Sequence, residues 1–170
     1  MVCLTAEVEN VGDCFLYEIA DRTLIITRTE KGIKAFHNSC LHRGRKLITH
    51  NCKKTEFVCP FHAITWDIEG KLIRNPIAWD MPQWTEENSR LPEAKTAIWG
   101  GFIFINMDIN APDFDVWAKP MIEDFEPYGW DNRYCEFWFE KHVRANWKTV
   151  SYTHLRAPRD KRQSRMPSSA

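Results

Sequence analysis

Two short segments of the sequence each pair one cysteine with one histidine. Cys40–His42 is a C-x-H motif and Cys59–His62 is a C-x-x-H motif, and 16 residues separate them. Ordinary zinc modules more often take two cysteines from one segment and two histidines from another. Mixed pairs instead suit two loops that hold a binuclear iron–sulfur cluster from opposite sides, with both sulfurs on one iron and both imidazoles on the other. We therefore predict that Cys40, His42, Cys59 and His62 are metal ligands and bind a [2Fe-2S] cluster.

This ligand set predicts electron transfer. Neutral imidazoles in place of anionic thiolates stabilise the ferrous state of their iron and raise its reduction potential. Imidazoles can also couple electron uptake to proton uptake. A structural zinc module is the alternative that the same four residues leave open, and it predicts a colourless protein with stoichiometric zinc.

The residues around the two motifs resemble the Rieske family, and more narrowly the large (alpha) subunit of Rieske non-haem iron, ring-hydroxylating oxygenases. Respiratory-type Rieske proteins usually carry an extra cysteine in each loop, whereas Arg45 and Phe61 stand at those places here, which favours the oxygenase or ferredoxin branch. One departure is Ala63-Ile64, where the oxygenase pattern commonly has Gly-Trp. The resemblance rests on Cys40–Gly44, Cys59–His62, Trp66-Asp67, Glu69–Leu72, Trp99–Asn106 and Asn146–Lys148.

The resemblance implies a longer parent protein in which one iron site accepts electrons and another reacts with the substrate. Electrons from NAD(P)H would pass through a reductase or a ferredoxin to the cluster, in which Cys40 and Cys59 hold one iron and His42 and His62 hold the other. They would then reach a mononuclear Fe(II) site, commonly in a neighbouring subunit of a homotrimer or an alpha-beta hexamer. There an aromatic or similar small organic substrate would be hydroxylated, by a mono- or dioxygenase reaction.

The mononuclear iron site of such an oxygenase is a 2-His-1-carboxylate triad, which we do not find in this sequence. We therefore expect the present fragment to accept electrons but to have no catalytic residues of its own for oxygenation. A stand-alone Rieske ferredoxin remains the alternative within the family. That alternative predicts a chain ending near Asp108, and residues 113–148 argue against it.

The two motifs lie among short strands separated by turns. Runs rich in β-branched and aromatic residues, with turn residues about every ten positions, favour an antiparallel all-β unit. We predict a mainly β fold over residues 1–108, a Rieske-type antiparallel β-sandwich or barrel with two cluster-binding loops. The predicted strands are 14–19, 23–28, 33–37, 56–59, 64–68, 71–73, 97–99 and 102–106, and the predicted turns include Asp21-Arg22, Lys31-Gly32, Glu69-Gly70 and Gly100-Gly101.

The pattern changes after residue 108, where we expect the beginning of a truncated α+β catalytic domain over residues 109–148. Apolar residues recur at helical spacing after Pro112, and Pro120 limits any single long helix. The alternating segment 134–140 predicts a strand with Cys135, Phe137 and Phe139 on one face.

The remaining cysteines and histidines have simpler interpretations. We predict that Cys52 is a small apolar filler and that Cys135 packs in the core. His37 is expected to be a core residue or to support the ligands from behind. His50 and His142 have no ligand partner at an informative spacing.

Composition excludes several functional classes. Lys and Arg number 23 and Asp and Glu number 23, so zero net charge gives no electrostatic reason to expect nucleic acid or a membrane as partner. A 44% hydrophobic and 27% charged composition is typical of a soluble globular protein. No apolar run approaches a membrane span, and acidic residues begin too early for a signal peptide. We expect a cytoplasmic, reducing environment, where metal binding outranks disulfides.

The last residues differ in character from the rest of the chain. Residues 150–157 and 164–170 correspond to codons that resemble a sequencing adapter used in transposase-based library preparation. We therefore expect residues 149–170 to be a non-native, adapter-derived tail, which excludes His154 as an iron ligand. We also expect native residues to precede Met1.

Overall fold

The computed structural model describes residues 1–85 and 87–151. They form two units, Met1–Arg133 and the segment that begins at Tyr134, and each is described by itself. Within the described residues, no helix combines the length and apolarity that crossing a membrane requires.

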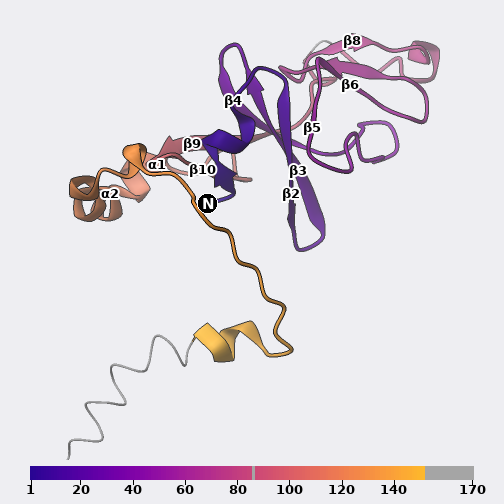
Figure 1. The fold of residues 1–170 in the computed structure, drawn as a ribbon. Helices are drawn as coiled ribbons and strands as arrows, with labels where there is room; N and C mark the ends of the chain where they lie inside the picture. The colour runs from indigo at the N-terminus through magenta and orange to yellow at the C-terminus, as the bar shows by residue number, and fades with distance from the viewer. Residues whose placement is uncertain (86, 152–170) are drawn as a thin grey trace, which may run out of the picture. The chain divides into compact units, whose positions relative to one another are not determined.

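The first unit contains two antiparallel sheets (Figure 1). The larger has seven strands in the order β1-β10-β9-β4-β3-β2-β5, and the smaller has three in the order β6-β7-β8. This confirms the predicted mainly antiparallel β fold. The strands are β1 (Cys3–Leu4), β2 (Asp13–Ile19), β3 (Arg22–Thr29), β4 (Gly32–His37), β5 (Cys52–Lys53), β6 (Glu56–Val58), β7 (Thr65–Asp67), β8 (Leu72–Arg74), β9 (Glu93–Trp99) and β10 (Phe102–Asn106).

The strands predicted between residues 14 and 106 are all present, but two turns lie one residue earlier than predicted. Arg22 pairs with Ile19 and therefore belongs to β3, and Gly32 pairs with Thr29 and belongs to β4. The first turn places Ala20 at a φ of 52°, in the left-handed region that tight hairpins require. β9 also begins earlier than predicted, at Glu93, because its first two residues pair with β4.

Alternating side chains divide the core between the two faces of the large sheet. Leu24 and Ile26 of β3 pack on one face with residues of β4, β9 and β10. Ile25, between them, packs on the other face, where the core also includes Trp66 of the small sheet and Cys40. The cysteine of the first motif is therefore buried in the core that joins the two sheets.

The two sheets meet closely at the turn between β7 and β8. Gly70 has a φ of 77°, and a Cβ atom built on it would lie 2.6 Å from Cε1 of Phe36 in β4. Only glycine satisfies both conditions. The connection from β8 to β9 also lies against this core, since Trp66 donates a 2.8 Å hydrogen bond from Nε1 to the Ser89 carbonyl.

Short helices lie between and after the strands of this unit. Pro120 lies in the first turn of α2, so the predicted limit on a single long helix is confirmed. The helical elements are η1 (Thr5–Val8), η2 (Ala78–Asp80), α1 (Phe114–Trp117), α2 (Lys119–Phe125), η3 (Glu126–Tyr128) and η4 (Trp130–Asn132).

The strand predicted over residues 134–140 is wrong. This segment has no regular secondary structure and belongs to neither sheet. Phe137 and Phe139 are exposed, and so is Cys135, which we expected in the core. Alternation stabilises a strand only when a neighbouring strand pairs with it, and no described residue does so here. Of the predicted tail 149–170, residues 152–170 lie outside the described residues, so its origin stays a prediction.

Candidate metal centre

Two loops carry the predicted ligands, and their backbones are folded in the same way. The first loop (residues 38–51) joins β4 to β5, and the second loop (residues 59–64) joins β6 to β7. In the first loop, Cys40 N–H donates to the Arg45 carbonyl, and Cys40 C=O accepts from Gly44 N–H, both at 2.8 Å. In the second loop, Cys59 makes the equivalent bonds with Ile64 and Ala63, at 2.8 and 3.0 Å. Each cysteine therefore begins an equivalent tight turn.

The same turn requires a left-handed residue four positions after each cysteine. Gly44 occupies this position in the first loop with a φ of 69°, and Ala63 occupies it in the second with a φ of 54°. A glycine adopts this conformation freely, whereas an alanine is strained by its Cβ. The departure from the Gly-Trp pattern at Ala63-Ile64 is therefore a backbone feature, and not only a change in packing.

The two cysteines lie together in the core between the sheets. Cys40 is 2% exposed and Cys59 is 1% exposed. Burial is the main cause that raises the pKa of the Cys40 thiol to about 11, and the neighbouring Cys59 side chain raises it further. Backbone N–H groups of His42 and Arg43 are directed at the Cys40 sulfur and act in the opposite sense. Such N–H groups also stabilise a sulfur that is bound to iron.

The two histidines face each other at the edge of this core. Their Nδ1 atoms are 3.3 Å apart, their ring centroids 4.8 Å apart, and their planes are inclined at 58°. A tetrahedral metal ion bound to two imidazole nitrogens at ~2.1 Å would hold those nitrogens about 3.4 Å apart. The two rings therefore stand at the separation that ligation to one ion requires.

The donor set fits a binuclear cluster better than a single ion. Among the described residues, no group of three or more His, Cys, Asp or Glu side chains is placed to hold one metal ion. A Rieske cluster requires two protein ligands on each iron. The structure brings together the predicted residues as two pairs of like donors, Cys40 with Cys59 and His42 with His62.

Asn38 holds the first loop from within, and sequence reasoning did not single it out. Its side chain is buried; Oδ1 accepts from the N–H groups of Leu47 and Ile48 at 2.7 and 3.0 Å, and Nδ2 donates to the Ile48 carbonyl at 2.8 Å. The only signal in the sequence is a polar residue directly after an apolar strand. Asn38 therefore fixes the far side of the loop whose near side carries Cys40 and His42.

The other cysteines and histidines lie apart from these pairs. Cys52 is half-buried and packs against the core, as predicted. His37 is half-buried at the end of β4, and burial, followed by the nearby Arg22, lowers its pKa. His50 lies in the first loop, where its Nδ1 is 3.2 Å from the neighbouring Thr49 hydroxyl.

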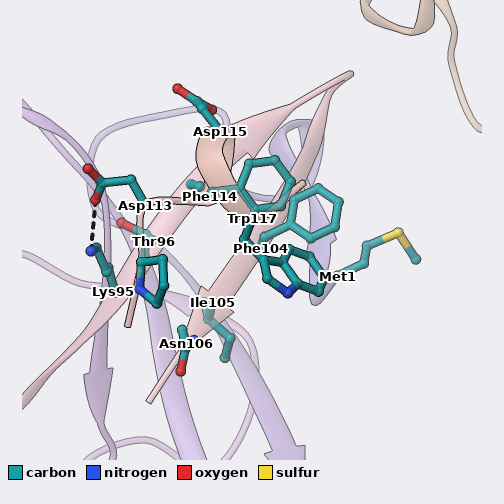
Figure 2. A pocket seen from close by; sticks show the side chains of 12 residues that line it. Met1, Lys95, Thr96, Phe104, Ile105, Asn106, Asp113, Phe114, Asp115 and Trp117 are labelled. Carbon is teal, nitrogen blue, oxygen red and sulfur yellow. Dashed lines mark ion pairs between the residues drawn. The ribbon is translucent and has the colours of Figure 1, made fainter. Parts of the chain in front are cut away.

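A separate cavity of about 410 Å³ lies at β9, β10 and α1 (Figure 2). Phe104 and Phe114 line it with ring centroids 4.5 Å apart, and Lys95 Nζ is 2.8 Å from Asp113 Oδ1 at its other side. No cysteine or histidine lines it. It is therefore distinct from the candidate metal centre.

Two equivalent turns that present two buried sulfurs and two facing imidazoles, on an antiparallel β scaffold, are the features of a Rieske-type iron–sulfur domain. The family description of the Rieske [2Fe-2S] domain matches residues 1–85. The chain belongs to this family, whose cofactor is a [2Fe-2S] cluster, as predicted.

Relatives extend the similarity beyond residue 85. The glycine betaine monooxygenase oxygenase subunit of Pseudomonas aeruginosa (strain UCBPP-PA14) is 30% identical over 150 residues, which cover 86% of this chain and 34% of that protein. The carnitine monooxygenase oxygenase subunit of Escherichia coli (strain K12) is 30% identical over 166 residues, covering 91% and 42%. The chain thus spans between a third and a half of the length of these relatives.

Solved structures give the same result. The crystal structure of the quaternary ammonium Rieske monooxygenase CntA in complex with γ-butyrobetaine has a TM-score of 0.80 at 26% identity, covering 91% of this chain and 45% of that one. Naphthalene 1,2-dioxygenase from Rhodococcus sp. has a TM-score of 0.64 at 25% identity, covering 75% and 29%. The predicted resemblance to Rieske oxygenase subunits is confirmed.

Proposed function

We propose that Cys40 and Cys59 bind one iron of the [2Fe-2S] cluster and that His42 and His62 bind the other. The observation that carries this assignment is the pairing of like donors by two turns with the same hydrogen-bond pattern. When bound, the cluster supplies one-electron transfer at a potential raised by its imidazole ligands. The chain would then be the electron-accepting part of a Rieske oxygenase alpha subunit.

The protein's own residues would have two tasks, to stabilise the sulfur ligands and to expose the imidazole ligands. The core excludes water from both sulfurs, and the N–H groups of His42 and Arg43 stabilise the charge on the Cys40 sulfur. The imidazoles lie at the partly buried edge, so electrons and protons would be exchanged there. Phe61, 56% exposed, lies beside the His62 ring with the Arg45 guanidinium 5.2 Å from its own ring centroid, and together they would shield this edge.

For the parent protein we propose O₂-dependent hydroxylation of a quaternary ammonium compound, with a mononuclear Fe(II) site outside this chain. Identity to the glycine betaine and carnitine monooxygenase subunits supports this substrate class. The higher TM-score of CntA than of naphthalene dioxygenase favours it over the aromatic substrate that the sequence suggested. The end of β10 at Asn106 supports a Rieske domain over residues 1–108 and the start of a catalytic domain over 109–148.

The proposed electron donor is a reductase or ferredoxin that uses NAD(P)H, and the charge around the loops supports an acidic docking surface on it. Residues 31–55 contain no Asp or Glu. Arg45, Lys46 and Lys54 line a hollow of about 270 Å³ next to the first loop. Opposite charges steer association and make its rate fall with salt. For the parent we retain a homotrimer or an alpha-beta hexamer as the proposed assembly and a cytoplasmic location.

The first experiment tests the cluster assignment. The full chain, and residues 1–148, are expected to show acid-labile sulfide with Rieske-type visible and EPR spectra. His42→Cys should lower the reduction potential or prevent loading, because a thiolate stabilises the ferric state. His50→Cys, in the same loop, is the matched control and should change neither. A colourless protein with stoichiometric zinc would show that the zinc alternative is correct.

The second experiment tests the substrate class. The complete gene product, supplied with donor and NAD(P)H, should oxidise glycine betaine or carnitine and leave naphthalene unchanged. The reverse preference would refute the quaternary ammonium proposal without affecting the cluster assignment. Electron transfer by the complete gene product without turnover of any substrate would support the stand-alone carrier instead.

A further inference from the structure

Cys14 and Cys52 lie directly opposite each other in the neighbouring antiparallel strands β2 and β5. Opposite residues of an antiparallel pair point to the same face, with Cα atoms about 4.5–5.5 Å apart. Disulfides form when Cα atoms are about 4.4–6.8 Å apart. Both side chains also belong to the same core region. The strand register thus places two free thiols within bonding reach, without moving the backbone.

The two thiols differ in their access to solvent. Cys14 is 3% exposed, and its Sγ makes only weak sulfur hydrogen bonds, to the Gly12 carbonyl at 3.3 Å and the Thr27 hydroxyl at 3.4 Å. Burial raises the pKa of Cys14 to about 11. Cys52 is half-buried and is one of the residues that line the same hollow as Arg45, Lys46 and Lys54. A small anionic molecule could therefore reach Cys52 through a basic entrance, but could not reach Cys14.

We propose that Cys14 and Cys52 form a reversible cross-strand disulfide, with Cys52 as the entry thiol and an anionic low-molecular-weight disulfide, such as oxidised glutathione, as oxidant. The Cys52 sulfur attacks the oxidant, forms a mixed disulfide and releases one thiol. The Cys14 sulfur then attacks the Cys52 sulfur and releases the second thiol. The protein loses two electrons and two protons, and one small disulfide becomes two small thiols.

The bond would act on the loop that carries two of the proposed cluster ligands. β5 is two residues long and follows the first loop directly. At this edge the chain is also held to β2 by the 2.8 Å hydrogen bond from Leu16 N–H to Asn51 Oδ1. A disulfide would fix the exit of the first loop to β2, and so oppose local opening of this loop. The proposed ligands Cys40 and Cys59 take no part in the reaction.

The test uses the iron-loaded full chain incubated with oxidised glutathione, with peptide mapping under non-reducing conditions. We expect a peptide that links Cys14 to Cys52, an unchanged visible spectrum, and a melting temperature higher by about 10 °C than that of the reduced protein. Dithiothreitol should reverse the change. Cys14→Ser should retain glutathione on Cys52, whereas Cys52→Ser should leave Cys14 unmodified. Cys135→Ser is the matched control and should still form the linked peptide.

Three outcomes would overturn the proposal. Glutathione found on the exposed Cys135 alone would show that Cys52 is not an entry thiol. A wild-type protein that retains glutathione on Cys52 would show that Cys14 cannot reach it. Links to Cys40 or Cys59 would assign the reactivity to the cluster ligands. If either serine variant fails to fold, the wild-type peptide map still decides among these outcomes.

Discussion

Replacing Ala63 by glycine should stabilise the protein, although most substitutions in folded proteins destabilise. Ala63 has a φ of 54°, and its side chain is exposed, so removing the Cβ loses little burial. Left-handed backbone disfavours a non-glycine residue by about 1–2 kcal/mol. Glycine offsets about 0.4–1 kcal/mol of this gain, because it increases the conformational entropy of the unfolded chain. The balance predicts a gain of about 0.5–1 kcal/mol in the free energy of unfolding.

Urea denaturation measures this gain, since a stability change without a change in slope moves only the midpoint. Ala20→Gly, at a φ of 52° in a distant hairpin, should give a gain of similar size. Ala78→Gly, exposed in η2 and outside the left-handed region, should lose about 0.5–1 kcal/mol. Because glycine keeps the N–H that donates to Cys59, the cluster spectrum should not change. An Ala63→Gly midpoint lowered as far as that of Ala78→Gly would refute the left-handed turn.

Four further results are expected. Gly70→Ala should lose about 3 kcal/mol or more in urea denaturation, because its Cβ would overlap a core phenylalanine ring at 2.6 Å and its φ is 77°. Asn38→Ala should lose about 3 kcal/mol in the same assay, since it leaves two buried N–H groups without their acceptor. The folded-state pKa of His37 is lowered, so the unfolded chain binds more protons than the folded protein near pH 6.5. The free energy of unfolding should therefore decrease as pH falls through 6.5, and melting curves of His37→Gln should lack this part of the pH dependence. The double variant His42→Arg, Arg43→His keeps composition and charge but should fail to load the cluster, as absorbance would show; a normal Rieske spectrum would contradict the ligand assignment.

The sequence predicted what depends on short segments. The strands over residues 14–37 could be predicted because alternation and turn residues are local. The specific spacing of the two motifs likewise predicted the family, and the ligand roles of their cysteines and histidines remain a prediction. The segment 134–140 has the same alternation, yet it forms no strand, because a strand also needs a partner that local sequence does not reveal. Asn38 was missed for a similar reason. Its hydrogen bonds join it to residues nine and ten positions away, and only the folded loop brings them together.

The difference between local spacing and the folded arrangement also explains why one motif is C-x-H and the other C-x-x-H. The two turns make equivalent hydrogen bonds from the cysteine backbone to the residues four and five positions later. Since the turns are alike, the one-residue difference in spacing changes where the imidazole leaves each turn. His42 leaves directly before the pair Arg43-Gly44, and His62 leaves directly before Ala63, so their Nδ1 atoms meet at 3.3 Å while both sulfurs stay in the core. The unequal spacing therefore lets two like turns place both imidazoles together at the edge and both sulfurs in the core. The exchange of His42 with Arg43 tests whether the proposed cluster needs this arrangement, because it makes the two spacings equal.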